Sequence, residues 1–249
     1  MPGPRLKKIA FLAPRPGMDL PTFFRYWREV HGPTVAAAPD YSTYRTRYAQ
    51  NHNLGAGPVG KPFPHPGAAI FHLPGDGSNE AEFSRSPTYR DHIRVDELNF
   101  IDMDRTLSMA AVETVLLPGT GPSKLLIIGR RRGGMARADF DQRLIAAATQ
   151  ALRDAPDFTA RLRGWALNHI VENSFSLPGA RAVDGNEIDC IQELWFSSDA
   201  DMDAAFACAG FRTHAQPAVQ GLFAPASLNA FRAREIVFFD ANNPIPPPA

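Results

Sequence analysis

The residues best suited to chemistry lie near the start of the chain: His31, Tyr48 and His52. Histidine exchanges a proton near neutral pH, so His31 and His52 are candidate acids or bases. Tyr48 and His52 stand four residues apart, about 13 Å along a strand, a spacing that suits the two ends of one substrate. We therefore predict that all three are catalytic, with His31 as the leading acid or base. Phe24 and Trp27 are expected to form a substrate-binding wall.

A helix over residues 19–31 must position His31. Asp19 can accept a free amide N–H of the first turn, where Pro21 loses nothing by having no N–H. Apolar residues recur at three- and four-residue spacings up to His31, which places the histidine at the edge of the core-facing side. Gly32-Pro33 is expected to stop or bend the helix, so that His31 lies at the carbonyl end, where a positive charge is favoured.

A strand predicted over Tyr44–Asn53 positions the other two candidates. Side chains alternate between the two faces of a strand, so Tyr48 and His52 share one face and Asn51 takes the other. Asn51 is therefore predicted either to bind substrate or to bond to a loop backbone.

Two further segments complete the expected site. The loop over residues 54–66 contains three glycines and four prolines and is a candidate lid, because long loops inside compact domains are often functional. The strand expected over residues 68–73 adds Phe71 as an apolar wall. It also adds His72 as a polar substrate-binding candidate.

The chain contains an internal repeat. His52 and His169 differ by 117 positions (169 − 52), and Glu113 and Glu235 differ by 122 (235 − 113), as expected if the second copy has a longer loop. Each copy follows the order β-α-β-β-α-β, which predicts an α+β fold of two ferredoxin-like units stacked sheet to sheet. The predicted divisions are residues 1–118 for the first repeat, 123–241 for the second, and 242–249 for a flexible tail.

The two copies differ where chemistry is expected. His31 falls opposite Ala148 and Trp27 opposite Leu144, so the first copy is the predicted active half. We expect the second cavity to be smaller, more apolar and catalytically silent. His169 is the exception, and we predict that it reaches the first cavity from the partner sheet as a substrate-binding group.

Composition excludes several classes of function. The chain has 249 residues and 26 basic against 26 acidic side chains, with no basic stripe, so nucleic acid is not an expected partner. Cys190 and Cys208 lack metal-ligand or disulfide spacing, and we expect reduced thiols in a cytoplasmic protein. No apolar run reaches the roughly 20 residues that span a membrane. The sequence predicts no metal site and no cofactor.

Four motifs carry a resemblance to a known family. Arg15-Pro16-Gly17, Tyr26-Trp27, His31-Gly32-Pro33 and Tyr48-x-Gln50-Asn51-His52 resemble the EthD family of the dimeric α+β barrel superfamily. The resemblance implies a tandem fusion in which two ferredoxin-like units form one pseudo-dimeric α+β barrel. Family relatives include cofactor-free decarboxylases, dehydratases and polyketide cyclases. More distant members include cofactor-free oxygenases, isomerases and haem enzymes.

The expected function follows from this resemblance and from the candidate acid and base. We predict a cofactor-independent lyase (decarboxylation, dehydration, retro-aldol cleavage or cyclisation) acting on a small aromatic, phenolic or polyketide-like substrate. Two alternatives stay open: a non-catalytic barrel that binds a small molecule, and a cofactor-free oxygenase of phenols. The two repeats form an internal pseudo-dimer, and the sequence does not settle whether the chain also forms a homodimer.

Overall fold

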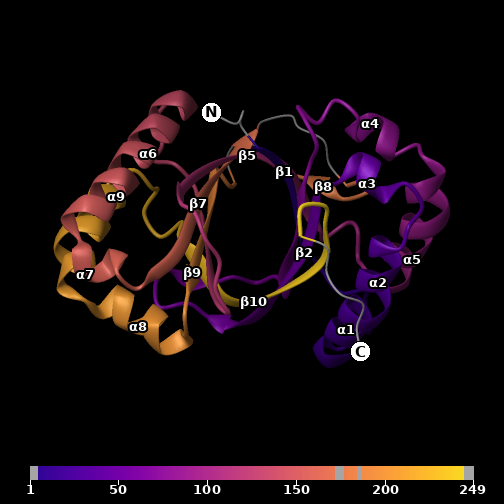
Figure 1. The fold of residues 1–249 in the computed structure, drawn as a ribbon, viewed down its shortest axis with the longest axis horizontal. Helices are drawn as coiled ribbons and strands as arrows, with labels where there is room; N and C mark the ends of the chain where they lie inside the picture. Colours follow the sequence, from indigo (N-terminus) through magenta and orange to yellow (C-terminus); the bar gives the residue numbers. More distant parts are fainter. Residues whose placement is uncertain (1–4, 172–176, 184–186, 244–249) are drawn as a thin grey trace.

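The fold is an antiparallel barrel of eight strands with helices on its outside (Figure 1). The computed structural model describes residues 5–171, 177–183 and 187–243. Around the barrel the strand order is β1-β4-β2-β10-β6-β9-β7-β5, and β5 closes on β1. The strands of the first half are β1 (Arg5–Leu12), β2 (Arg47–Ala56), β4 (Gly67–His72) and β5 (Leu107–Leu117). Those of the second are β6 (Ser123–Gly129), β7 (Leu162–Val171), β9 (Cys190–Phe196) and β10 (Asn229–Asp240).

The two halves are joined by exchanged edges. The last strand of each repeat pairs with the second strand of the other, β5 with β7 and β10 with β2. The register is equivalent at both junctions, with Glu113 opposite Asn168 and Glu235 opposite Asn51. Two short strands, β3 (Lys61–Pro62) and β8 (Arg181–Ala182), add in parallel to β10 and β5. The predicted α+β fold, with two ferredoxin-like repeats in one barrel, is confirmed.

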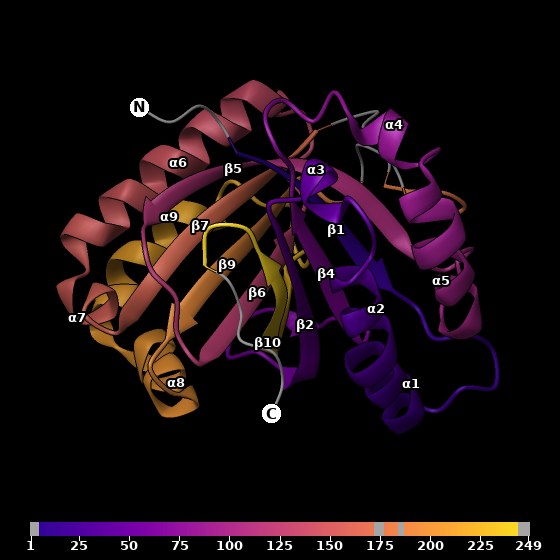
Figure 2. The same cartoon turned by 45° about the vertical axis from the view of Figure 1, so that its right-hand side comes forward.

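Each half carries its own helix layer, on opposite sides of the barrel (Figure 1). Figure 2 shows α1, α2 and α5 on the outer face of the first-half strands. The first layer contains α1 (Leu20–Tyr26), a π-helical turn (Trp27–His31), α2 (Gly32–Ala36), α3 (Tyr41–Tyr44), α4 (Glu80–Phe83), a second π turn (Thr88–Ile93) and α5 (Arg94–Phe100). The second contains α6 (Arg137–Asp154), α7 (Pro156–Thr159), α8 (Asp199–Ala207), a π turn (Phe211–Ala215) and α9 (Gln216–Gln220).

The helix that carries His31 does not end there, which corrects the sequence interpretation. Asp19 caps it as predicted, accepting the Thr22 N–H at 2.7 Å, but Gly32 begins α2 and the helical path continues to Ala36. The Gly32 N–H bonds to the Trp27 carbonyl, five residues back. This wide π turn lets a proline follow without stopping the helix. His31 is therefore not at a carbonyl end and gains no charge stabilisation from one.

Two other segments differ from expectation. Tyr44 belongs to α3, and β2 begins only at Arg47. The loop predicted as a lid places Phe63 against Phe11 of β1, with ring centroids 4.5 Å apart, and against Phe231 of β10. Phe11 and Phe231 belong to the apolar cluster inside the barrel. The loop therefore packs on the barrel interior rather than on the helix layer that contains His31.

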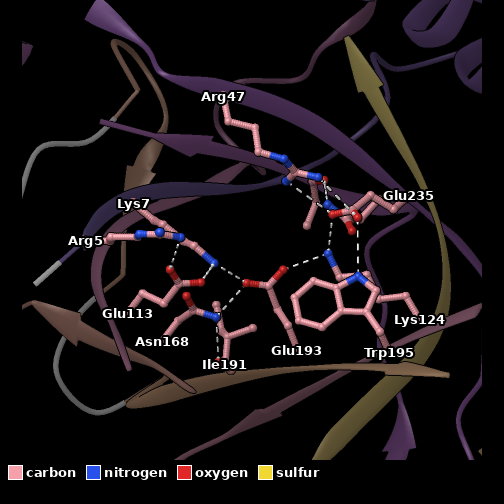
Figure 3. A network of polar contacts seen from close by, with 12 residues as sticks. Arg5, Lys7, Arg47, Glu113, Lys124, Asn168, Ile191, Glu193, Trp195 and Glu235 are labelled. Atoms are coloured by element: carbon pink, nitrogen blue, oxygen red, sulfur yellow. Dashed lines mark hydrogen bonds and ion pairs between the residues drawn. The ribbon is translucent and has the colours of Figure 1, made fainter. Parts of the chain in front are cut away.

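The other end of the barrel interior is charged (Figure 3). Glu193 bridges Lys7 and Lys124, with Oε1 2.5 Å from the Lys7 Nζ and Oε2 2.7 Å from the Lys124 Nζ. Lys7 also contacts Glu113 at 2.5 Å, and Lys124 contacts Glu235 at 2.6 Å. Burial alone would raise the pKa of Glu193, but the two lysines hold it well below the usual carboxyl range. This network links the two halves through Glu193, and Arg47 adds a second link by pairing with Glu235 at 3.3 Å.

Candidate functional site

His31 is held by a carboxylate on the neighbouring helix. Its Nδ1 lies 2.7 Å from Oδ2 of Asp96 on α5, and the Tyr26 hydroxyl donates to Oδ1 of the same carboxylate at 2.6 Å. The His31 ring packs on Phe100 with centroids 4.8 Å apart, and the residue is 4% exposed. Burial would raise the pKa of Asp96, yet the hydrogen bonds from His31 and Tyr26 lower it below its usual value. A carboxylate thus orients the imidazole.

A second carboxyl group lies next to the first but behaves in the opposite way. Glu97 is 4% exposed, and burial raises its pKa above the usual value. It accepts the Tyr89 hydroxyl at 2.8 Å, and Arg94 lies 3.4 Å away. Adjacent carboxyl groups with pKa values pushed apart are typical of acid–base sites.

The predicted pair on β2 is linked by the residue between them. The Gln50 amide donates to the Tyr48 hydroxyl at 3.0 Å and to the Trp27 carbonyl at 2.6 Å, while its oxygen lies 2.8 Å from His52 Nε2. Tyr48 and His52 therefore share a face, as predicted. Burial, together with Arg28, lowers the pKa of His52 to about 4, so this imidazole is neutral at physiological pH.

Aromatic rings surround these polar groups. The His52 ring is stacked on Trp27 at 4.6 Å and on Phe24 at 5.0 Å, and Tyr48 is stacked on Phe71 at 4.8 Å. The structure thus brings together every predicted aromatic wall residue with Tyr48 and His52. The Trp27 indole N–H is buried and, within the described part of the chain, has no acceptor at hydrogen-bond geometry.

The second half of the chain contributes Phe238 to this layer. Phe238 lies at a bulge in β10, between Val237 and Phe239, and its ring stacks on Tyr48 with centroids 5.8 Å apart. A Cβ atom on Gly32 would lie 2.3 Å from the Phe238 ring. The glycine after His31 is therefore required by close approach of an aromatic ring.

Two predicted substrate-binding residues lie on the other side of the sheet. Asn51 is fully buried and donates to the Ala68 carbonyl of β4 at 3.3 Å, facing the barrel interior. His72 also faces the interior, where burial and Lys7 lower its pKa to about 2. Lys7 is opposite His72 in the first half, and Lys124 is opposite Trp195 in the second. Trp195 is therefore the repeat partner of His72. Neither Asn51 nor His72 shares a layer with His31.

His169 does not reach the first layer, contrary to the prediction. It faces the second-half helices, where its Nδ1 lies 2.8 Å from Oδ1 of Asp141 on α6. The side chain is 9% exposed, and the other ring nitrogen has no hydrogen-bond partner among the described residues. Alternation on β7 explains this placement, because the helix-side face of each half packs on its own helices.

Sequence interpretation missed Asp96 and Glu97. Nothing in their local pattern indicates a site, since they lie in a polar helical segment. The repeat offset was the available signal: Asp96 falls opposite Ala218 and Glu97 opposite Val219, at 122 positions (218 − 96). The second half thus lacks both partners of the pair, because His31 is matched by Ala148.

The sequence resemblance also implies distant relatives that bind haem, so the first layer can be compared with what a haem site needs. The Nδ1 of His31 is bonded to Asp96. The Nε2 of His52 is bonded to Gln50, and the His52 ring is stacked on Trp27 and on Phe24. A macrocycle would have to displace these stacked rings, so the residues present do not fit a haem. Over the described ranges, no group of three or more His, Cys, Asp or Glu side chains is arranged to hold a metal ion.

Comparison with solved structures shows which proteins share this fold. A structure named as a "putative monooxygenase" from Lactobacillus acidophilus NCFM has a TM-score of 0.59 at 9% identity, covering 96% of this chain and 97% of its own. A second of the same name, from Fusobacterium nucleatum, has a TM-score of 0.52 at 7% identity, with 94% and 92% covered. One named as a "Putative Chlorite dismutase" has a TM-score of 0.50 at 6% identity, with 94% and 95% covered. These similarities show a shared α+β barrel fold.

One family model matches within the first half. Residues 15–104, which lie in the first repeat of the barrel, are similar to the EthD domain. No curated protein sequence matches the chain. No helix among the described residues is long and apolar enough to cross a membrane.

Proposed function

We propose that the first-half helix–sheet layer is the active site of a cofactor-independent lyase acting on a small aromatic or phenolic substrate. The observation that carries this proposal is the buried His31–Asp96 pair, which is matched by Ala148 and Ala218 in the second half. An aligned imidazole and carboxylate form a general base, and the stacked aromatic rings around them match a planar substrate.

In this proposal the pair removes a proton from the substrate. Asp96 accepts the Nδ1 proton, which fixes the tautomer and leaves Nε2 of His31 as the basic atom. When Nε2 takes a proton, the Asp96 carboxylate stabilises the imidazolium that forms. Tyr26 supports the geometry by donating to the second carboxylate oxygen.

Two groups are suited to give a proton or to hold a substrate oxygen. Burial raises the pKa of Tyr48, so its hydroxyl stays protonated, and burial likewise raises the pKa of Glu97. We assign the hydrogen-bond donor role to Tyr48 and that of the proton source to Glu97. His52, neutral and stacked on Trp27, is assigned to positioning Gln50 and thereby Tyr48.

Asp96→Asn tests this assignment against a matched control, Asp141→Asn, which alters the second His–Asp pair. Turnover is measured on a panel of hydroxybenzoic acids and phenolic ketones by ring absorbance and CO₂ release. We expect Asp96→Asn to lower kcat by roughly 10²- to 10⁴-fold. Asp141→Asn is expected to leave kcat within a few-fold. A loss confined to Asp141→Asn would contradict the proposal.

A cofactor-free oxygenase of phenols is the second candidate. The same base would remove the phenolic proton, and two proteins of this fold are named as putative monooxygenases. An oxygen electrode separates the two reactions, because only the oxygenase consumes O₂ in step with substrate. Tight phenol binding without turnover of either kind would instead support a non-catalytic binding barrel.

A further inference from the structure

A buried charged cluster lies on the helix side of the first-half sheet, apart from the His31–Asp96 pair. Glu80 of α4 pairs with Arg45 (Oε2 to Nη1, 2.8 Å; Oε1 to Nη2, 3.2 Å) and also with the Lys8 Nζ on β1. All three side chains are 2% exposed or less. Charges this deep are costly unless they are paired or used.

The cluster carries more positive than negative charge. Lys8 and Arg45 share the single carboxylate of Glu80. Burial lowers the pKa of Lys8, and nearby Arg45 lowers it further. The next carboxyl group, Glu97, already interacts with Tyr89 and Arg94. Glu97 attracts Lys8 electrostatically, but among the described residues Glu80 is the carboxylate in direct contact with both cations.

Hydrogen-bond donors at the cluster also lack acceptors. Within the described residues, neither the Arg45 Nε nor the Tyr41 hydroxyl has a hydrogen-bond partner, although both atoms are buried. A buried donor left unpaired costs about 1–3 kcal/mol. Tyr41 and Arg45 both lie beside Phe83. The Tyr41 and Phe83 ring centroids are 6.3 Å apart, and the Arg45 guanidinium carbon is 4.1 Å from the centre of the Phe83 ring. What both atoms lack is an acceptor oxygen.

The second half shows that the fold does not need this cluster. Leu125 falls opposite Lys8 and Leu162 opposite Arg45 at the 117-residue offset, and Met202 falls opposite Glu80 at 122. Phe158 replaces Tyr41 and removes its hydroxyl. All four replacements belong to one apolar core cluster. The same architecture therefore forms with apolar residues at these four positions.

We propose that the ligand of the first-half layer is an aromatic acid, whose carboxylate binds Arg45, Tyr41 and Lys8. This inference rests on the proposed function only in placing the ligand in that layer. The Arg45 guanidinium lies 5.6 Å from the Phe71 ring, and Phe71 stacks on Tyr48. Phe71 therefore lies next to both Tyr48 and the Arg45 cation, so a ring bound in this layer can direct a carboxylate toward Arg45. Because the cluster is closed, binding requires α3 or α4 to move aside.

Matched probes test the charge requirement. Salicylate and salicylamide share a ring and a hydroxyl and differ in the carboxylate, and their binding is measured by isothermal titration calorimetry without any turnover. We expect the wild-type protein to bind salicylate about tenfold or more tightly than salicylamide. Equal affinities, or no binding of salicylate, would overturn the proposal. Asp96→Asn, which tests the proposed catalysis, is expected to leave this preference unchanged.

The triple variant Lys8→Leu/Arg45→Leu/Glu80→Met gives the first half the residues of the second. Replacing a complete buried charge cluster with apolar residues is often neutral or stabilising. We expect an unchanged or higher melting temperature and loss of the preference for salicylate, with salicylamide affinity retained. A preference that survives would overturn the proposal. If this variant fails to fold, Tyr41→Phe decides: the preference should fall several-fold, and an unchanged preference would overturn the proposal.

Discussion

The two halves share one fold and differ in what fills the layer between helices and sheet. Phe23 and Phe140 stand at equivalent positions, both fully buried, so the packing of the two first helices begins alike. Beyond them nine polar or charged positions of the first layer are apolar in the second, although the second layer keeps the His169–Asp141 pair. The first-half residues are Lys8, His31, Tyr41, Arg45, Tyr48, Gln50, Glu80, Asp96 and Glu97. Their counterparts are Leu125, Ala148, Phe158, Leu162, Trp165, Leu167, Met202, Ala218 and Val219.

This difference separates the needs of folding from those of function. The second half shows that apolar residues satisfy the architecture. Burying polar and charged groups lowers stability unless each is paired. The first half keeps them together in one layer, where several donors have no hydrogen-bond partner among the described residues. Such local departures from the best-folding sequence are expected at functional sites.

The helices differ in the same way. The π turns at Thr88–Ile93 and Phe211–Ala215 occur at equivalent positions in both halves, so they belong to the fold. The π turn at Trp27–His31 is matched by an uninterrupted part of α6, which runs for 18 residues. Single π turns inside α-helices occur often at functional sites. This turn carries both Trp27 and His31.

The largest expected change concerns Glu193, a carboxylate that joins the halves through Lys7. Its counterpart in strand register is Ile70, so Glu193→Ile makes the two halves alike at this point. The substitution leaves Lys7 and Lys124 without their shared partner. We expect a loss of about 3–5 kcal/mol in unfolding free energy, measured by urea titration. Ile70→Val is the matched control and should cost about 0.5–1.5 kcal/mol. Equal losses in both variants would refute the bridging role.

Acid should weaken the same junction. Burial opposes ionisation of Glu235, but Lys124 and Arg47 lower its pKa to about 2, from 4.5. A lowered pKa contributes stability above pH 4.5 that is lost as the pH falls toward 2. We expect Glu235 to account for on the order of 3 kcal/mol of this loss. Glu235→Gln should flatten the acid limb of a plot of unfolding free energy against pH. A limb of unchanged slope would contradict this.

A smaller effect is expected where the second half touches the first. Gly32 faces Phe238, whereas the equivalent pair in the second half is Thr149 and Leu116. In the second half the larger Thr149 thus replaces glycine, and the smaller Leu116 replaces phenylalanine. Gly32→Ala should cost about 1–3 kcal/mol by overpacking. Adding Phe238→Ala should recover part of that cost, and strictly additive losses in the double-mutant cycle would exclude the contact.

The smallest effect concerns helix capping. Asp19 caps α1, whereas Ala136, at the 117-residue offset, leaves α6 without a side-chain cap. Ala136→Ser should raise the unfolding free energy by about 0.5–1 kcal/mol, measured by thermal denaturation. Asp19→Ala should act in the opposite direction. No gain from Ala136→Ser would show that the caps of the two helices are not comparable.

The sequence predicts the architecture well because the repeat is periodic and local. The repeat, with offsets of 117 and then 122, predicts the β-α-β-β-α-β order of each half, and the alternation of residues 48, 50 and 52 predicts the face of Tyr48 and His52. His31 and the aromatic wall were also found by spacing. These features depend on neighbours along the chain.

What the sequence could not supply depends on contacts between distant segments. The partner of His31 lies 65 residues away on α5, and that of His169 lies 28 residues away on α6. Gly32-Pro33 is expected from sequence to stop or bend the helix, because local rules do not anticipate a π turn. The glycine is explained only by Phe238, more than two hundred residues later. Pairing across the fold therefore had to be seen in the structure.

The central claim is that the first half is active and that the second half, with a more apolar helix layer, is inactive. The most direct test compares His31→Ala with His169→Ala for turnover of the same phenolic substrate, with folding checked by circular dichroism. We predict that His31→Ala lowers kcat by roughly 10²-fold or more, and that His169→Ala stays within a few-fold of the wild type. If His169→Ala abolishes turnover and His31→Ala leaves it intact, the active half is the second.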